Sequence, residues 1–344
     1  MPAEARMMQE QHMEDRDGLT GEEKQVSAGI CCQAKENALP VALRSCISSE
    51  EPMLSKCVGS LLDASGLSLS PGMRVLVKPN LLRADPLSCT DPHVVAAVCR
   101  WLLDQGCRVT VSDSPGFGRA ESIAREIGLE QALFPLNLRC TSLTQPIWEE
   151  VLVHERSLQL PVAQSALDCD LIMSVPRIKA HSQLALTLCV KNCFGCVPGM
   201  HKACMHTLYG KHEEIFAGLL AALLDLLPPV AGFCDGIVAM HVTGPSKGQP
   251  YPLHLLGASV SALALDRAIC TVLGQRFEAL PLGRELLQRF PSCLQTELFF
   301  PFSSPDDCRV TDFIVPRQLL TMSFAPHRLL VSCLRRLWAK WMHR

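Results

Sequence analysis

From about residue 39 onward, short apolar runs alternate with amphipathic stretches. The apolar runs at 40–47, 74–80 and 107–113 have the length of strands, whereas residues 53–62 and 90–105 repeat apolar side chains at helical spacing. Gly106 is placed to end the second of these helices before the next strand begins. This order of strands and helices predicts a parallel sheet with helical crossovers.

The same pattern returns after a less regular middle segment. Strands are predicted at 170–178, 230–240 and 253–262, and helices at 213–227 and around Asp266 and Arg267. We therefore expect an α/β fold with a mostly parallel sheet and helical crossovers. Two lobes, about 39–165 and 166–275, would surround a central cleft.

The two ends of the chain differ from this core. Residues 1–38 are polar and lack apolar periodicity, which predicts a disordered tail. Residues 276–344 predict a helical extension that ends in a basic amphipathic helix from about residue 326. Such a helix would dock on the domain, contact an anionic membrane surface weakly or fill a partner's groove.

Composition narrows the function classes. The chain has 344 residues, of which 48% are hydrophobic, and its 32 basic and 34 acidic residues give a net charge of −2. No segment concentrates Lys and Arg as a nucleic-acid groove does. The first 25 residues lack an apolar signal segment, and Asp225 with two prolines interrupts the apolar stretch at 215–233. We expect a cytoplasmic protein without a transmembrane span or a nucleic-acid partner.

Cysteine is abundant, with 18 residues spread over the chain. In a chain of this size most should be reduced thiols that pack as small apolar groups, which would suit anaerobic metabolism. Cys189, Cys193 and Cys196 have the spacing C-x3-C-x2-C, which can also ligate a 4Fe–4S cluster. Packing and cluster binding are both open interpretations of these three thiols.

Two predicted strands end in residues that can bind an anion. In parallel sheets the ligand crevice lies beyond the carboxyl ends of the strands. Lys78 and Asn80 follow one strand, although Lys78 could simply extend to the sheet edge and Asn80 cap a turn. The second strand end carries Asp113, Ser114, Gly116 and Gly118 before a predicted helix. Its backbone amides would suit a phosphate or carboxylate, but an ordinary strand-to-helix turn has the same composition.

Residues 175–206 form the densest candidate site and contain no Asp or Glu. The segment carries Arg177, Lys179, Lys191, Lys202, His181, His201 and His206. Such a positive segment favours an anionic substrate, with lysine holding a carboxylate, a phosphate or a covalent cofactor and histidine exchanging a proton. We assign catalytic roles to His181, Lys191, Asp113 and Lys179. The loop at 235–251, with His241, Ser246 and Lys247, would form a lid.

Several motifs in order resemble a known family. They are VLVKPNLL, TDPHVV, VSDSPG, the whole 175–206 segment, DGIVAMHVTGPSKG and ALDRAI. Together they resemble the prokaryotic domain-of-unknown-function family 362 over about residues 40–275. That family is often joined to ferredoxin-like iron–sulfur modules, so the resemblance implies a ferredoxin-type electron donor as partner. After residue 308 this chain has only Cys333, so the module itself is missing.

A more distant resemblance concerns the run from His181 to His206. Its order and approximate spacing are similar to the core of the nickel-pincer lactate racemase family. The resemblance implies that His181 is the acid/base, Lys191 the tether of a nickel-pincer-like cofactor and His206 the metal ligand. The chain departs from that family because Leu-Cys-Val, not Ser-Gly-Gly, precedes Lys191.

These observations define two candidate functions. The first is a racemase/epimerase-like or redox enzyme whose anion-binding cleft takes a small carboxylate or phosphate substrate, by His/Lys acid–base or metal-assisted chemistry. The second is an iron–sulfur electron carrier or cluster-binding redox protein without catalysis of its own.

Overall fold

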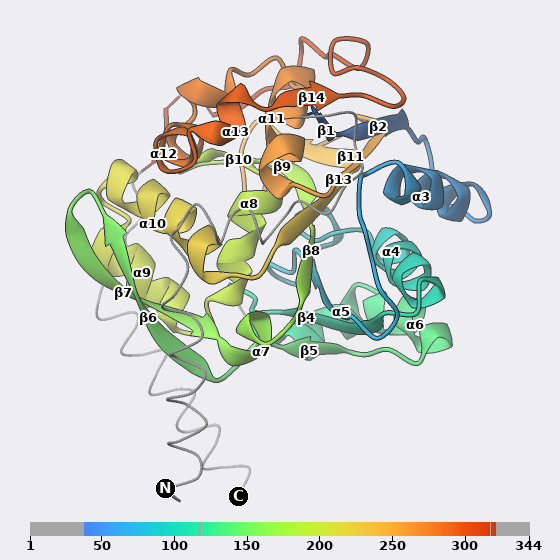
Figure 1. Cartoon of the computed structure of the whole chain (residues 1–344), viewed down its shortest axis with the longest axis horizontal. Coiled ribbons are helices and arrows are strands. Elements are labelled where there is room, and N and C mark those ends of the chain that lie inside the picture. The colour runs from blue at the N-terminus through green and yellow to red at the C-terminus, as the bar shows by residue number, and fades with distance from the viewer. Residues whose placement is uncertain (1–37, 117, 317, 321–344) are drawn as a thin grey trace, which may run out of the picture. The chain divides into compact units, whose positions relative to one another are not determined.

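One large sheet organises the protein. The computed structural model describes residues 38–116, 118–316 and 318–320. Within them the main sheet has ten strands, with the central order β10-β9-β11-β8-β3-β4-β5 (Figure 1). The strands joined by parallel pairing are β3 (Arg74–Pro79), β4 (Arg108–Asp113), β5 (Cys140–Ser142), β8 (Leu171–Val175), β9 (Arg177–His181) and β11 (Val230–His241). The predicted α/β fold with a largely parallel sheet is confirmed.

Antiparallel strands complete the sheet at one side. They are β2 (Ala42–Ser45), β10 (Ala185–Thr187), β12 (Gln249–Tyr251) and β13 (Leu255–Ser259). The expected opening strand is β2, and it pairs with β13 rather than entering the parallel series. An apolar run indicates a strand but not its direction or its neighbour, which explains the difference.

Helix α4 (Pro92–Asp104) follows its sequence signals closely. The Asp91 carboxylate accepts a hydrogen bond of 2.8 Å from the amide of His93, and Pro92 occupies the first turn. Gly106, at φ 78°, follows the helix in the left-handed conformation. The other α-helices of the described residues are α3 (Met53–Asp63), α5 (Ala120–Glu126), α6 (Leu129–Leu133), α7 (Gln164–Leu167), α8 (Cys189–Asn192), α9 (His201–Tyr209), α10 (Glu213–Leu226), α11 (Ala262–Val272), α12 (Pro281–Arg289) and α13 (Ser292–Gln295).

The sheet separates two apolar cores. Val75 and Val77 of β3 pack in the core that contains the buried faces of α3 and α4, whereas Leu76 packs in the core of α10 and α11. Because side chains alternate along a strand, Lys78 continues the face of Leu76. On β8, Ser174 likewise continues the face of Ile172. Both polar side chains therefore project toward α8.

Two segments differ from their expected form. Strand 170–178 was predicted as one element, but Pro176 separates β8 from β9, since proline cannot donate a ladder hydrogen bond. The irregular middle contains an antiparallel hairpin of β6 (Pro146–Val153) and β7 (Arg156–Ala163).

The described cysteines are free thiols and most of them are buried. Among the described residues no helix is long and apolar enough to cross a bilayer.

The segment after residue 275 is not purely helical. Besides α12 and α13 it contains β14 (Glu297–Phe299), which pairs in parallel with β1 (Ala38–Pro40). The basic helix expected from residue 326 lies outside the described residues, as does the expected tail at 1–38 except for Ala38, the first residue of β1. The expected lobe boundary near residue 165 falls within one sheet, because β8 pairs with both β3 and β11. A two-lobed cleft stays a prediction.

Candidate active site

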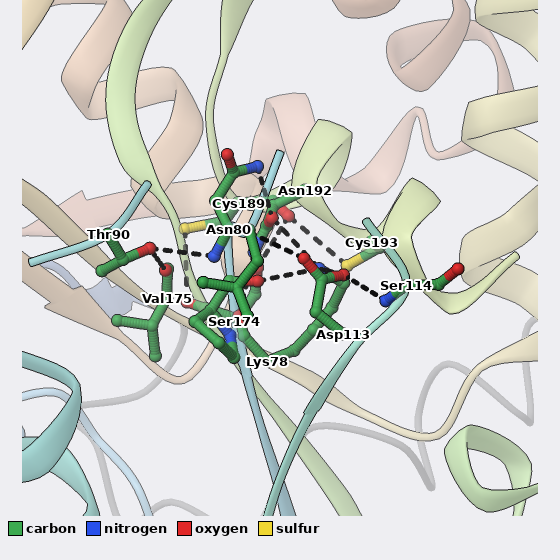
Figure 2. Close-up of polar contacts among 12 residues, drawn as sticks. Lys78, Asn80, Thr90, Asp113, Ser114, Ser174, Val175, Cys189, Asn192 and Cys193 are labelled. Atoms are coloured by element: carbon green, nitrogen blue, oxygen red, sulfur yellow. Dashed lines mark hydrogen bonds and ion pairs between the residues drawn. The ribbon is translucent and has the colours of Figure 1, made fainter. Parts of the chain in front are cut away.

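A buried ion pair lies at the carboxyl ends of β3 and β4. Lys78 Nζ is 2.7 Å from Asp113 Oδ1, and the two side chains are 1% and 4% exposed (Figure 2). The carboxylate also accepts backbone hydrogen bonds from Leu81 (2.7 Å) and Ser114 (2.8 Å). A buried pair is tolerated only when the remaining donors and acceptors are satisfied, and these bonds meet that condition.

Asn192, at the end of α8, joins the strand ends to this helix. Its Nδ2 donates to the carbonyl of Lys78 (3.0 Å) and to Ser174 Oγ (3.1 Å). Its Oδ1 accepts from Asn80 Nδ2 (2.9 Å) and from Lys78 Nζ (3.2 Å) (Figure 2). Asn192 was not among the predicted site residues, yet it uses its full capacity of two donors and two acceptors here.

Lys179 reaches the same network from β9. Its Nζ donates to Asn80 Oδ1 (2.6 Å) and to the carbonyl of Ser88 (2.7 Å). Burial lowers the pKa of Lys179 to about 8, and the charge of Arg177 lowers it further. We call Lys78, Asn80, Asp113, Lys179 and Asn192 the inner network. Arg177 instead pairs with the buried Asp235 at 3.2 Å.

His181, the last residue of β9, is buried and held in one tautomer. Its Nδ1 accepts hydrogen bonds from the amides of Gln183 (3.1 Å) and Leu184 (3.2 Å), so the proton of the neutral ring is on Nε2. Burial, followed by the charges of Lys191 and Lys179, holds the pKa of His181 well below its usual value. Neutral His181 is therefore a hydrogen-bond donor through Nε2.

Lys191 on α8 and Lys202 on α9 are half-buried. We call them the outer lysines. Burial lowers the pKa of each to about 7, and repulsion from Lys78 lowers both further. Within the part of the chain that the structure describes, neither outer lysine nor Lys179 has a carboxylate within 4.0 Å. Lys191 Nζ lies 5.7 Å from the ring centroid of Phe194.

His206 lies beside the outer lysines. Its ring centroid is 4.6 Å from that of Phe216, and burial together with the charges of Lys191 and Lys202 lowers the pKa of His206 to about 3. His206 and His181 are neutral imidazoles, but the charged groups nearest to them are ammonium groups. Among the described residues, neither histidine belongs to a group of three potential metal ligands. These side chains therefore do not form a three-ligand metal site by themselves, and the expected role of His206 as a single metal ligand stays a prediction.

The predicted glycine loop lies apart from these charges. Gly116 and Gly118 are exposed, and their nearest non-neighbouring atoms belong to Leu82 and Ile123. Ser114 contacts the basic segment 175–206, since its Oγ accepts a hydrogen bond of 2.7 Å from the amide of Gly199. The helix that follows, α5, has only seven residues, so the expected anion site at its start has little support.

Gly195 is a residue that sequence reasoning missed. A Cβ at this position would lie 2.2 Å from Asp113 Oδ1 and 2.2 Å from Lys78 Nζ. Only glycine lets this backbone cover the ion pair so closely. The glycine in CFGC, inside the basic segment, was the available signal, but only the fold reveals what it contacts.

The three motif cysteines are buried on α8 and on a 3-10 turn, η3 (Cys193–Cys196). Cys193 donates to the carbonyl of Cys189 (3.4 Å), and burial raises the pKa of Cys193 to about 12. Cys189 Sγ instead lies 3.4 Å from Cys234 Sγ, near Asp266. Among the described residues the three motif sulfurs do not come together as one group of ligand atoms, which favours the packing interpretation over a cluster.

The expected lid loop lies against β9. The carbonyl of Gly244 accepts a hydrogen bond of 2.9 Å from the amide of Ser182, next to His181. His241 packs between Tyr251 and Phe313, at centroid distances of 4.9 and 5.8 Å. Motion of this loop, with Ser246 and Lys247, stays a prediction.

The chain is similar to several known proteins. A family model described as domain of unknown function 362 matches residues 75–271. Thylakoid-associated protein sll1697 of Synechocystis sp. is 32% identical over 286 residues, which cover 82% of this chain and 88% of that protein. The apoprotein structure of lactate racemase from Thermoanaerobacterium thermosaccharolyticum aligns with a TM-score of 0.41 and 11% identity. That alignment covers 69% of this chain and 57% of the racemase.

Proposed function

Because this chain belongs to the domain-of-unknown-function family 362, we propose a function from its site: it binds a small carboxylate- or phosphate-bearing substrate and catalyses proton transfer on it. One observation carries the proposal. The outer lysines have no carboxylate within 4.0 Å among the described residues, and Asp113, whose charge acts on both of them, is already paired with Lys78. Uncompensated cations in a half-buried position favour an anionic ligand.

The geometry supports distinct roles for these side chains. The inner network is buried and its bonds are satisfied, so it positions the strand ends rather than contacting the ligand. The outer lysines are half-buried, more exposed than the lysines of the inner network, and would meet the anion first. Since the pKa of Lys191 is about 7, a fraction of its amines is neutral at physiological pH and can accept a proton.

His181 complements Lys191 in this mechanism. With Nδ1 accepting from two backbone amides, the proton is on Nε2, and this N–H would stabilise negative charge that develops on a substrate oxygen. This role differs from the acid/base role implied by the sequence, since two backbone amides already occupy Nδ1. We therefore propose Lys191 as the proton-exchanging group and His181 as the donor.

The alternative function, an iron–sulfur carrier that exchanges electrons with a ferredoxin-type donor, has weaker support. Cys189, Cys193 and Cys196 are buried, and burial raises the pKa of each. Anaerobic purification followed by iron and sulfide analysis separates the two functions. Stoichiometric iron with a visible chromophore that Cys193→Ala abolishes would support the carrier and contradict our assignment of these thiols to packing.

Location is a further part of the proposal. We propose the cytoplasm, because the described cysteines are free thiols, as is usual in a reducing compartment. The name of the Synechocystis relative raises association with a membrane surface as the competing location. Fractionation of cells that express the full chain, with and without residues 326–344, distinguishes a free protein from one held at a membrane by that segment.

Calorimetric titration with inorganic phosphate and with oxalate tests the binding site. We expect at least one anion to bind, and Lys191→Met to weaken its binding about tenfold or more while circular dichroism stays unchanged. Lys211→Met is the matched control, because Lys211 is exposed. Equal losses in both variants, or undetectable binding of both anions to the wild type, would contradict the proposal.

A further inference from the structure

A second chemically equipped site lies where β2 meets α3. Cys46 follows β2, and Cys57 lies on α3. Both thiols line one cavity of about 300 Å³, and they are only 3% and 7% exposed. The rest of the lining is exposed: Arg44, Ser45, Ile47, Met53 and Lys56. The two thiols thus form the floor of a cavity with an exposed rim.

The two thiols are coupled and unlike each other. A hydrogen bond with Cys57 is the main reason that the pKa of Cys46 is lowered to about 7. The charge of Arg44 lowers it slightly more, and burial and the charge of Asp235 oppose the shift. Cys46 Sγ also contacts the carbonyl of Ser48 at 3.2 Å. The pairing raises the pKa of Cys57, so Cys46 is the thiol of the two that ionises first. Most other described cysteines with shifted pKa values are raised by burial, as for Cys99 and Cys140.

The rim of the cavity is positive. Arg44 donates to Ser60 Oγ at 3.0 Å and lies over the ring of Phe302 at 5.5 Å, so its guanidinium is held at the site. Lys56 follows on the first turns of α3. Two cations beside a thiolate favour an oxidant that carries carboxylates.

We propose that Cys46 and Cys57 form a redox-active dithiol that exchanges with an anionic low-molecular-weight disulfide of the glutathione type. The Cys46 thiolate attacks one sulfur of that disulfide, forms a mixed disulfide and releases one thiolate. Cys57 then loses its proton, attacks Cys46 Sγ and releases the second thiolate. Two protein thiols are oxidised to one disulfide while one small disulfide is reduced to two thiols.

The test uses full-length chain in which Cys31, Cys32 and Cys333, which lie outside the described residues, are replaced by Ser. With oxidised glutathione at pH 7.5 we expect the protein to lose the mass of two hydrogens, and peptide mapping to link Cys46 to Cys57. With Cys57→Ser we expect a single glutathione adduct on Cys46. With Cys46→Ser neither the adduct nor the disulfide should form at this site.

Charge and pH provide independent readouts. Lys56→Glu should slow the reaction with oxidised glutathione several-fold but leave the reaction with neutral hydroxyethyl disulfide unchanged. Alkylation of Cys46 should rise with pH through a midpoint near 7, not near 9. Peptide mapping that finds Cys46 and Cys57 reduced while other thiols are oxidised would overturn the proposal, and it requires no substitution at either cysteine. A midpoint near 9 would overturn it as well.

Discussion

The inner network and the outer lysines are neighbours, yet their charges differ in how far partners within the chain compensate them. In the inner network Lys78 is paired with Asp113, and Asn192 uses both of its donors and both of its acceptor positions. The outer lysines, 191 and 202, have no carboxylate partner among the described residues, and the pKa of each is lowered to about 7. The charged groups of the inner network are paired or hydrogen-bonded within the chain, whereas the outer lysines are left partly uncompensated, as the proposed anion site requires.

The strongest test of the inner network is Gly195→Ala. The new Cβ would meet Asp113 and Lys78 at 2.2 Å and force the ion pair apart. Since a separated buried pair leaves an uncompensated charge, we expect the free energy of unfolding to fall by about 3–5 kcal/mol in urea denaturation. Gly59→Ala is the control, because its Cβ would meet only Trp101, at 3.9 Å, and should be neutral or slightly stabilising. Equal stability of the two variants would mean that the pair contributes nothing to the fold.

Asn192→Ala should have a smaller effect on the same network. It removes the acceptor used by Asn80 and Lys78 and the donor used by the Lys78 carbonyl and Ser174. We expect the free energy of unfolding to fall by about 2 kcal/mol, the usual cost of leaving buried polar groups without partners. A loss below about 0.5 kcal/mol would show that water replaces the amide and that the inner network is looser than described.

His206, beside the outer lysines, can be tested through the pH dependence of the free energy of unfolding. Folded His206 has a pKa of about 3, whereas an unfolded histidine binds its proton near pH 6.5. Between these values the unfolded state binds more protons, so stability contributed by neutral His206 is lost as the pH falls from about 6.5 toward about 3. Asp266, whose pKa is raised to about 7, acts in the opposite direction.

We expect His206→Phe to make the pH dependence of unfolding between pH 6.5 and 4.5 shallower, by about 1 kcal/mol or less because the ring is only half-buried. Phenylalanine suits this position beside Phe194 and Phe216. His93→Gln, at an exposed position, should leave the slope unchanged. An unchanged slope in His206→Phe would contradict the assignment of a neutral imidazole.

The smallest effect is expected for Lys191→Met on stability. The folded lysine releases its proton near pH 7, and an unfolded lysine does so near 10.4, so wild-type stability should rise between pH 7 and 8.5. In Lys191→Met part of that rise should disappear. The free energy of unfolding should differ from that of the wild type by well under about 1 kcal/mol at any one pH. A large loss of stability would place Lys191 among the groups that hold the fold.

Local signals predicted much of the fold. The caps of α4, the Val/Leu run of β3 and the helix that became α10 depend on residues close in sequence, and each element appears within a few residues of its expected bounds. The antiparallel pairing of β2 with β13 joins segments about two hundred residues apart. Such pairing depends on register and packing that a local pattern does not contain.

The candidate site shows the same limit. Strand ends and the basic segment 175–206 were enough to select Lys78, Asp113, Lys179, His181 and Lys191 as candidates, and Lys191 lies on α8 rather than at a strand end. The partners Asn192 and Gly195 were missed because their importance comes from contacts with β3, more than a hundred residues away. Arg177 was noted as one of several cations, but its pairing with Asp235 could not be read from the sequence.

The most direct test of the central claim is proton uptake on anion binding at pH 7.5. Oxalate is fully ionised at this pH, so protons taken up during binding must go to the protein. An anion bound beside the outer lysines should raise their pKa from about 7, which draws protons from the buffer. Calorimetry in buffers of different ionisation enthalpy should therefore give a net uptake of about one proton in the wild type and less in Lys191→Met. Binding without proton uptake, or with equal uptake in the two proteins, would contradict the claim that the outer lysines form the anion site.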